Sequence, residues 1–184
     1  AKYVEILDRK ADRLKVLIED LFEVSKMTSG NVELLKQKVD IAQLLQQITG
    51  ERKEDFTTAG LDLRVSIQNQ PLFASVDGQK LWRVLDNLMN NTLNYSLIGT
   101  RVYATLSEQN GVAKITMKNV SKYELAEDTM ELSERFKRAD LARHTEGSGL
   151  GLAIAQSIIE LHGGKMEIEA DGDLFKVTIS LPCM

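Results

Sequence analysis

Apolar residues recur at helical spacing through the opening part of the chain. The spacing alternates between four and three, with an interruption at Lys10, in Tyr3, Leu7, Leu14, Leu17, Leu21 and Val24. No glycine or proline occurs before Gly30. This heptad-like stripe predicts one long helix over residues 1 to about 29, wide enough for a helix bundle. Such a helix needs partner helices, from a second chain or from sequence outside this one, unless it packs on the domain that follows.

From residue 32 onward the apolar pattern alternates between strands and helices. A helix is predicted over 41–60, and Asp77 is a suitable N-cap for a second helix over 78–96. Asn110-Gly111 is a turn signal between two strands, so 101–120 is expected to form a hairpin. Further strands are expected within 32–40, 61–67 and 71–76.

The C-terminal third begins with a polar segment and ends with a second hairpin. Residues 121–147 lack periodicity, and so long a loop in a compact domain is usually functional or mobile. A helix over 148–161 ends at Gly163-Gly164, and strands over 165–170 and 174–181 follow. The element order predicts an α+β fold, a mixed sheet with helices on one face, preceded by the long helix.

Charge and cysteine content narrow the class of protein. The net charge of −4 over 184 residues argues against a broad electrostatic surface for nucleic acid. One cysteine, Cys183, allows neither an internal disulfide nor a paired-cysteine zinc site. No apolar run reaches the roughly 18 residues of a membrane span, and no signal peptide is present, so we expect an intracellular chain without membrane contact.

Two segments carry candidate chemistry. Gly147, Gly149 and Gly151 are crowded before the helix over 148–161, where backbone N–H groups can approach an anion. Taken alone, this cluster also fits a flexible hinge and helix start with no ligand, and its spacing matches neither a dinucleotide fingerprint nor a P-loop.

The second segment is a row of asparagines. Asn87, Asn91 and Asn94 share one face of the helix over 78–96, with Asn90 nearby. Amide oxygens suit a hard cation such as Mg²⁺, which also binds phosphate oxygens. A solvated polar face is the alternative when this segment is considered alone.

Together the two segments resemble bacterial sensor histidine kinases of two-component systems. The stretch NLMNNTLNYS resembles their asparagine box, and GSGLGLAIA, followed by the histidine and glycines that end at Gly164, resembles their second glycine box. Phe136 matches the lid phenylalanine, and the opening helix is similar to the second helix of their dimerisation and phosphotransfer hairpin. The resemblance implies a Bergerat-type ATP-binding α/β sandwich over 31–184 and a partial hairpin over 1–30.

The resemblance also implies ligand-binding roles. Asn91 would bind Mg²⁺, the glycines would contact the phosphates of ATP, and basic residues of the 121–147 loop would screen phosphate charge. Asn87 lies where related ATPases carry a glutamate base, and an amide cannot take up that proton. The residues expected at the nucleotide are Asn87, Asn91, Asn94, Tyr95, Asn119, Phe136, Lys137, Arg138, Arg143, Gly147, Ser148, Gly149, Leu150, Gly151 and Leu152.

The chain departs from the family pattern at three places. Asn119 and Ser121 stand where the first glycine box has its aspartate and first glycine, and Asn94 replaces a common lysine. Because an amide both accepts and donates, we expect Asn119 to discriminate adenine from guanine less strongly than an aspartate would. These changes keep open a second reading, a nucleotide-binding or protein-interaction module with impaired catalysis.

The third departure concerns the phosphoacceptor. The chain has two histidines: His144 in the polar loop, expected to be a lid contact, and His162, expected to be a structural cation at a helix C-terminus. The family's acceptor histidine is therefore expected on a hairpin helix outside this sequence, so no catalytic residue is assigned here. The implied function is transfer of the ATP γ-phosphoryl group to that histidine for relay to a response regulator. The implied partners are that hairpin, a response regulator and a second copy joined through the hairpin. The implied location is the cytoplasmic part of a membrane-bound sensor. A further alternative function is an ATPase of the wider superfamily.

Overall fold

The computed structural model describes residues 33–68, 70–125 and 150–184, together with scattered positions between 4 and 26. At every described position from 4 to 26 the backbone is helical, which agrees with the predicted long helix. Large apolar side chains along it are exposed to solvent: Val4, Leu7, Leu14, Ile18, Leu21 and Phe22.

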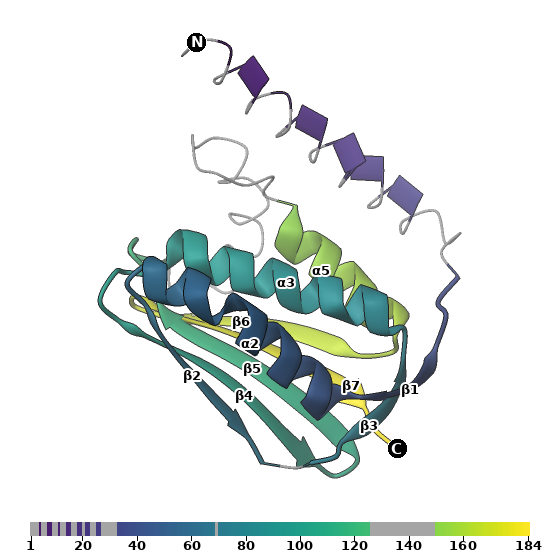
Figure 1. Ribbon diagram of the computed structural model, residues 1–184. Coiled ribbons are helices and arrows are strands. Elements are labelled where there is room, and N and C mark those ends of the chain that lie inside the picture. Colours follow the sequence, from purple (N-terminus) through teal and green to yellow (C-terminus); the bar gives the residue numbers. More distant parts are fainter. Residues whose placement is uncertain are drawn as a thin grey trace.

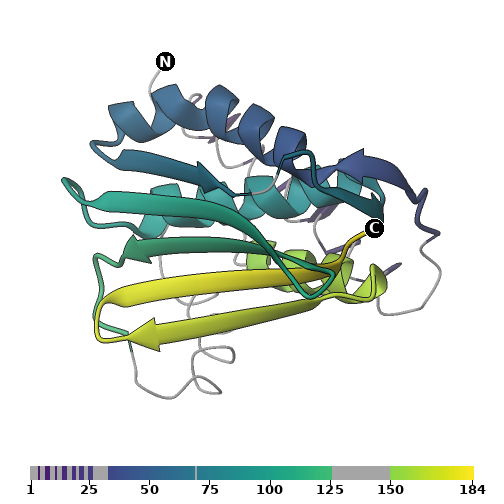
Figure 2. The same ribbon diagram turned by 90° about the horizontal axis from the view of Figure 1, so that it is seen from below.

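A five-stranded mixed sheet forms the base of the domain (Figures 1 and 2). The strands are β2 (Asp62–Ile67), β4 (Arg101–Gln109), β5 (Val112–Val120), β6 (Lys165–Asp171) and β7 (Leu174–Pro182). Their spatial order is β2-β4-β5-β7-β6, and β2 pairs with β4 in parallel while the other neighbours are antiparallel. Both predicted hairpins are confirmed, and the left-handed Asn110 (φ 55°) and Gly111 (φ 76°) make the turn between β4 and β5.

Three helices cover one face of this sheet (Figure 1): α2 (Ile41–Thr58), α3 (Gly78–Tyr95) and α5 (Gly151–Leu161). Strand residues alternate accordingly. In β5, Ala113, Ile115 and Met117 are buried beneath the helices, and Lys118 faces solvent. The core therefore lies in a single layer between helices and sheet, and the predicted fold class is confirmed.

A separate pair of short strands lies beside the main sheet. β1 (Gln37–Asp40) pairs antiparallel with β3 (Phe73–Val76). The strand expected over 32–40 thus occupies only its last four residues. Asp40 ends β1 and caps α2, because its Oδ1 accepts from the N–H groups of Ala42 and Gln43.

Candidate functional site

The start of α3 is anchored by Asp77, as the sequence predicts. Its Oδ1 accepts from the N–H of Lys80 and its Oδ2 from the N–H of Leu35, both at 3.1 Å. Burial would raise the pKa of Asp77, but these hydrogen bonds outweigh it and the pKa lies below its ordinary value. The cap therefore joins α3 to the segment that leads into β1.

His162 belongs to the same cluster. Its Nε2 accepts the N–H of Asp77 at 2.9 Å, and its Nδ1 lies 2.7 Å from the carbonyl oxygen of Ile158, to which it donates. Burial lowers the pKa of His162 below its ordinary value. The expectation of a cation at this helix end is therefore wrong: the imidazole is neutral, because one ring nitrogen must accept a backbone N–H away from solvent.

Burial decides which side of α3 can meet a ligand. Leu81, Val84, Leu85, Leu88 and Met89 are buried against the sheet and the neighbouring helices. Asn87, Asn91, Asn94 and Tyr95 are only half-buried. The asparagine row thus lies along the border of the core.

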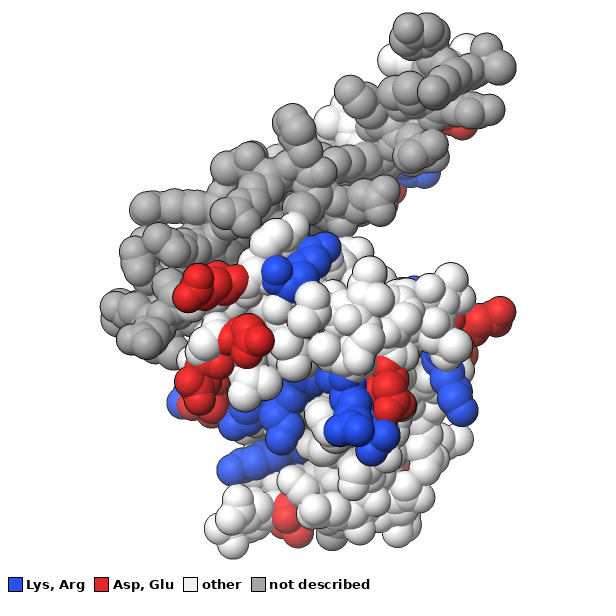
Figure 3. Space-filling model, turned by 90° about the vertical axis from the view of Figure 1, so that its left-hand side faces the viewer, with Lys and Arg blue, Asp and Glu red and all other residues white. Residues whose placement is uncertain are grey.

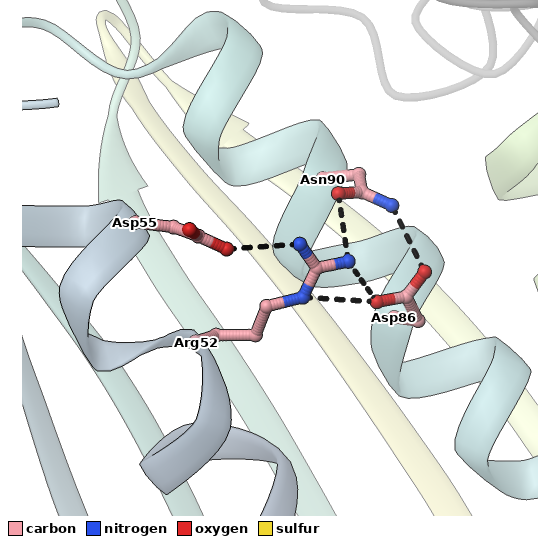
Figure 4. A network of polar contacts seen from close by, with 4 residues as sticks. All are labelled: Arg52, Asp55, Asp86 and Asn90. Atoms are coloured by element: carbon pink, nitrogen blue, oxygen red, sulfur yellow. Dashed lines mark hydrogen bonds and ion pairs between the residues drawn. The ribbon is translucent and has the colours of Figure 1, made fainter. Parts of the chain in front are cut away.

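A polar network between α2 and α3 fixes the position of this row (Figure 4). Arg52 of α2 donates to Asp86, to Asn90 at 3.2 Å and to Asp55 at 3.0 Å. The Nδ2 of Asn90 donates in turn to Asp86 at 3.0 Å. The hydrogen bond to Asp86 contributes most to raising the pKa of Arg52. Since Asp86 and Asn90 immediately precede Asn87 and Asn91, the network restrains the rotation of α3 about its axis.

Sequence reasoning did not identify Arg52 or Asp86. Their residue numbers differ by 34, and each is an ordinary charged residue on an amphipathic helix. Only the packing of α2 against α3 brings them together.

The asparagine row meets the start of α5. The Nδ2 of Asn87 donates to the carbonyl oxygen of Gly151 at 3.1 Å. A Cβ on Gly151 would lie 3.6 Å from the Cγ of Asn87, an ordinary contact. No side chain in the described part of the chain caps the N-terminus of α5, at Leu150. The last residues of the glycine cluster, Leu150, Gly151 and Leu152, therefore lie at a helix start beside Asn87, where N–H groups favour an anion.

Asn91 and Asn119 line one narrow pocket between α3 and the sheet, which is closed in the ligand-free chain. The other lining residues are Leu88, Thr92, Met117, Phe175 and Val177. Asn119 lies near the end of β5 and is only 4% exposed. Among the described residues, its side-chain amide has no hydrogen-bond partner, which is costly for a buried polar group. This orphaned amide fits a ligand with its own donors and acceptors, such as a nucleotide base.

Asn91 is the residue of this pocket that could hold magnesium. The amide oxygen of Asn91 is a hard ligand, and phosphate oxygens would complete the shell with water. The described residues contain no group of three His, Cys, Asp or Glu side chains arranged for a metal.

Lys122 lies at the C-terminal end of α3. Its Nζ donates to the carbonyl oxygen of Asn94 at 2.5 Å and lies 5.9 Å from the ring centroid of Tyr95. Ser121 is buried beside it, and its hydroxyl accepts from the N–H of Tyr123 at 3.1 Å. Lys122 supplies a positive charge at the Asn94 end of the row, and its sequence context alone gave no reason to expect it there.

Several predicted site residues lie outside the described residues. These are Phe136, Lys137, Arg138, Arg143, Gly147, Ser148 and Gly149, and His144 lies there as well. On the side of the molecule in Figure 3, basic and acidic side chains both occur among uncharged ones. None of the helices in the described ranges is long and apolar enough to span a bilayer.

Comparison with known families identifies this arrangement. Residues 76–183 match the family "Histidine kinase-, DNA gyrase B-, and HSP90-like ATPase". The chain belongs to this family. The match runs from the end of β3 to the end of β7 and so includes α3, the pocket and α5. Membership in this ATPase family makes the domain an ATP-binding one.

Individual relatives are named as sensor proteins and histidine kinases. The sensor protein VanSC of Enterococcus gallinarum is 32% identical over 98% of this chain and 50% of its own length. The crystal structure of full-length ShkA in complex with AMPPNP matches with a TM-score of 0.83 at 23% identity, over 99% of this chain and 38% of that one. Histidine kinase ThkA, in complex with the response regulator protein TrrA, matches with a TM-score of 0.75 at 19% identity, over 100% of this chain and 51% of that one.

These findings confirm the resemblance to sensor histidine kinases that the asparagine and glycine segments indicated. The structural matches, at this identity, show a shared fold. The chain spans about half the length of the first curated relatives it matches.

Proposed function

We propose that the chain binds ATP with Mg²⁺ and transfers the γ-phosphoryl group to a histidine on the first helix of a hairpin in the parent kinase. One observation carries the proposal: Asn91 and Asn119 line the same pocket, and the buried amide of Asn119 lacks a partner among the described residues. A base that reaches the amide of Asn119 as the pocket opens would satisfy it, and Asn91 would bind the magnesium that neutralises the phosphates.

The phosphates would extend from this pocket toward the start of α5. Gly147, Ser148, Gly149 and Gly151 would bring backbone N–H groups to them, and Lys137, Arg138 and Arg143 would screen their charge. Phe136 would close over the nucleotide. Phosphoryl transfer depends mainly on positioning and charge neutralisation, and these residues would supply both.

Two features bear on where the phosphoryl group goes. Asn87 holds the carbonyl oxygen of Gly151 with its amide, and an amide is not a general base for water. His162 is buried with both ring nitrogens engaged, so it is a poor acceptor. We therefore assign the acceptor to a hairpin whose second helix is residues 1–30, with residues 31–184 as the catalytic domain.

We further propose the cellular setting. The chain would act in the cytoplasm, where ATP is available, as part of a sensor kinase. A response regulator would receive the phosphoryl group, and the hairpin would join two copies. ThkA, which forms a complex with the response regulator TrrA, supports this assignment.

The test is calorimetric titration of ATP with and without Mg²⁺, followed by addition of a purified hairpin that carries a histidine. We expect magnesium-dependent binding, no stable radiolabel on the chain itself, and label on the hairpin. Binding without transfer would favour an impaired nucleotide-binding module, a reading that the amide in place of a carboxylate at Asn119 supports. Steady ATP hydrolysis by the chain alone would instead indicate an ATPase.

A second titration tests base recognition. Asn119 can donate as well as accept, so the ratio of ATP to GTP affinity is expected to rise in Asn119→Asp. An unchanged ratio would remove Asn119 from the base site.

A further inference from the structure

A groove of about 450 Å³ lies between α2 and β2 and shares no lining residue with the Asn91–Asn119 pocket. One wall is a stripe of α2 at helical spacing, with Gln46, Thr49, Gly50 and Lys53. The other wall is formed by every second residue of β2, namely Leu63, Val65 and Ile67. Val65 is 42% exposed, a large value for a β-branched residue in a strand.

The backbone of β2 is open along this groove. β2 is an edge strand that pairs in parallel with β4. On the β4 side, the N–H of Asp62 donates to the carbonyl oxygen of Thr100, and the N–H of Gln68 donates to that of Leu106. In a parallel ladder the intervening odd-numbered residues then direct their N–H and C=O groups away from β4. No strand among the described residues pairs with that edge, so it presents a template for another strand.

Gly50 widens the groove and has no internal reason to be glycine. It lies in the middle of α2, where glycine weakens a helix relative to alanine. A Cβ at this position would meet nothing within 4 Å among the described atoms. The missing side chain therefore serves no packing need inside the domain, and its effect is to leave room for something from outside.

The charged residue named in the lining of the groove is basic, Lys53. Lys53 is exposed, and its ammonium takes part in none of the ion pairs between described residues. The other polar lining residues, Gln46, Thr49 and Gln70, are uncharged. α2 and β2 run in opposite directions (Figure 2), and α2 leads directly into β2 along the chain. Lys53, in the second half of α2, therefore lies toward the Leu63 end of the strand.

We propose that the groove binds an extended segment of a partner protein, which adds as a strand beside β2. Its backbone would pair with Leu63, Val65 and Ile67, and its alternate apolar side chains would enter the groove. An acidic residue of the segment would pair with Lys53 at the Leu63 end. Main-chain pairing supplies affinity in this mode, and the side-chain positions supply specificity.

The experiment selects binders from a random peptide library displayed against the full chain and measures their affinity as synthetic peptides. Selected peptides are expected to share an alternating apolar pattern with an acidic residue at one end. They should slow amide hydrogen exchange at Leu63, Val65 and Ile67. In Gly50→Leu, which fills the groove with a better helix former, affinity should fall at least about 10-fold. In Lys53→Glu, selection should favour a basic residue in place of the acidic one.

ATP affinity in both variants is the control, and it should match the unmodified chain because the groove is separate from the pocket. The proposal is overturned if no peptide is enriched, if selected peptides lack the alternating pattern, or if Gly50→Leu binds them unchanged. A concentration-dependent dimer without peptide that Val65→Arg abolishes would also overturn it, in favour of a second copy as the occupant.

Discussion

Two polar clusters at opposite ends of α3 differ in how completely their groups are paired. At the N-terminal end, Asp77 accepts two backbone N–H groups and donates its own N–H to His162, which in turn donates to Ile158. Near the C-terminal end, Asn91 and Asn119 line a pocket, and the buried amide of Asn119 has no partner among the described residues.

Whether a buried polar group has a hydrogen-bond partner within the chain distinguishes groups that stabilise the fold from groups that are suited to bind a ligand. A buried polar group without a partner costs about 1–3 kcal/mol, whereas a paired one is close to neutral or stabilising. A fold that retains an orphaned amide at such a cost gains something when the amide is satisfied. On this reasoning the Asp77–His162 cluster is structural, and we propose that the Asn91–Asn119 pocket is functional.

The largest effect is expected at Asn91. Asn91→Ala removes the proposed magnesium ligand, so magnesium-dependent ATP affinity should fall at least about 100-fold, equivalent to about 2.7 kcal/mol. Calorimetric titration of ATP with and without Mg²⁺ measures this affinity. Gln47→Ala, which removes an exposed helical amide of α2, is the matched control and should bind as the unmodified chain. Unchanged affinity in Asn91→Ala would break the assignment of α3 to the nucleotide.

Asp77→Ala should act on stability. It removes the cap of α3 and the acceptor of the Leu35 N–H, so the free energy of unfolding should fall by about 2 kcal/mol. Urea denaturation measures the change, and Asp62→Ala, at an exposed position of β2, should shift it by less than about 0.5 kcal/mol. Equal losses in the two variants would show that the buried cluster is not structural.

Asn119→Leu should have opposite effects on stability and on binding. Replacing an orphaned amide with an apolar side chain of similar size should raise the stability of the nucleotide-free chain by about 1 kcal/mol. ATP affinity should fall in the same variant. A thermal melt and an ATP titration on one preparation test both, and a loss of stability would mean that the amide is already satisfied within the chain.

The smallest effect concerns pH. The pKa of His162 is lowered in the folded chain, so below about pH 6.5 the unfolded chain takes up a proton that the folded chain does not. Stability is therefore fully present above this pH, and it should fall by less than about 1 kcal/mol between pH 7 and pH 6. His162→Gln should remove this slope. His144→Gln should retain it, which distinguishes the two histidines, and a slope that follows His144 instead would contradict the assignment.

Local signals were sufficient for most elements of the fold. The turn at Asn110-Gly111, the Asp77 cap and the strand alternation of β5 each depend on neighbours within a few residues, and the structure agrees with all three. β1 was predicted too long because its pairing with β3 begins only at Gln37. Pairing between distant segments leaves no local signal in either one.

In the candidate site, too, some features were predictable from local sequence and others were not. The sequence supplied the asparagine row and the glycine cluster, and resemblance assigned them to one nucleotide. Whether Phe136 and the glycines from Gly147 to Gly149 meet that nucleotide stays a prediction, because they lie outside the described residues. The sequence did not predict the roles of Arg52, Asp86 and Lys122. A single charged residue on a surface helix or loop does not indicate a role until its neighbours in space are known.

The amino-acid sequence by itself determined most helices and strands, the fold class and the family, because periodicity, caps and motif spacing are all properties of short stretches of chain. Tertiary structure decided which polar groups are satisfied. It paired His162 with Asp77 across 85 positions and joined Asn87 to Gly151 across 64, and it left the amide of Asn119 without a partner among the described residues. Hydrogen bonding and desolvation depend on distances in space, and only packing of α3 and α5 against the sheet sets those distances.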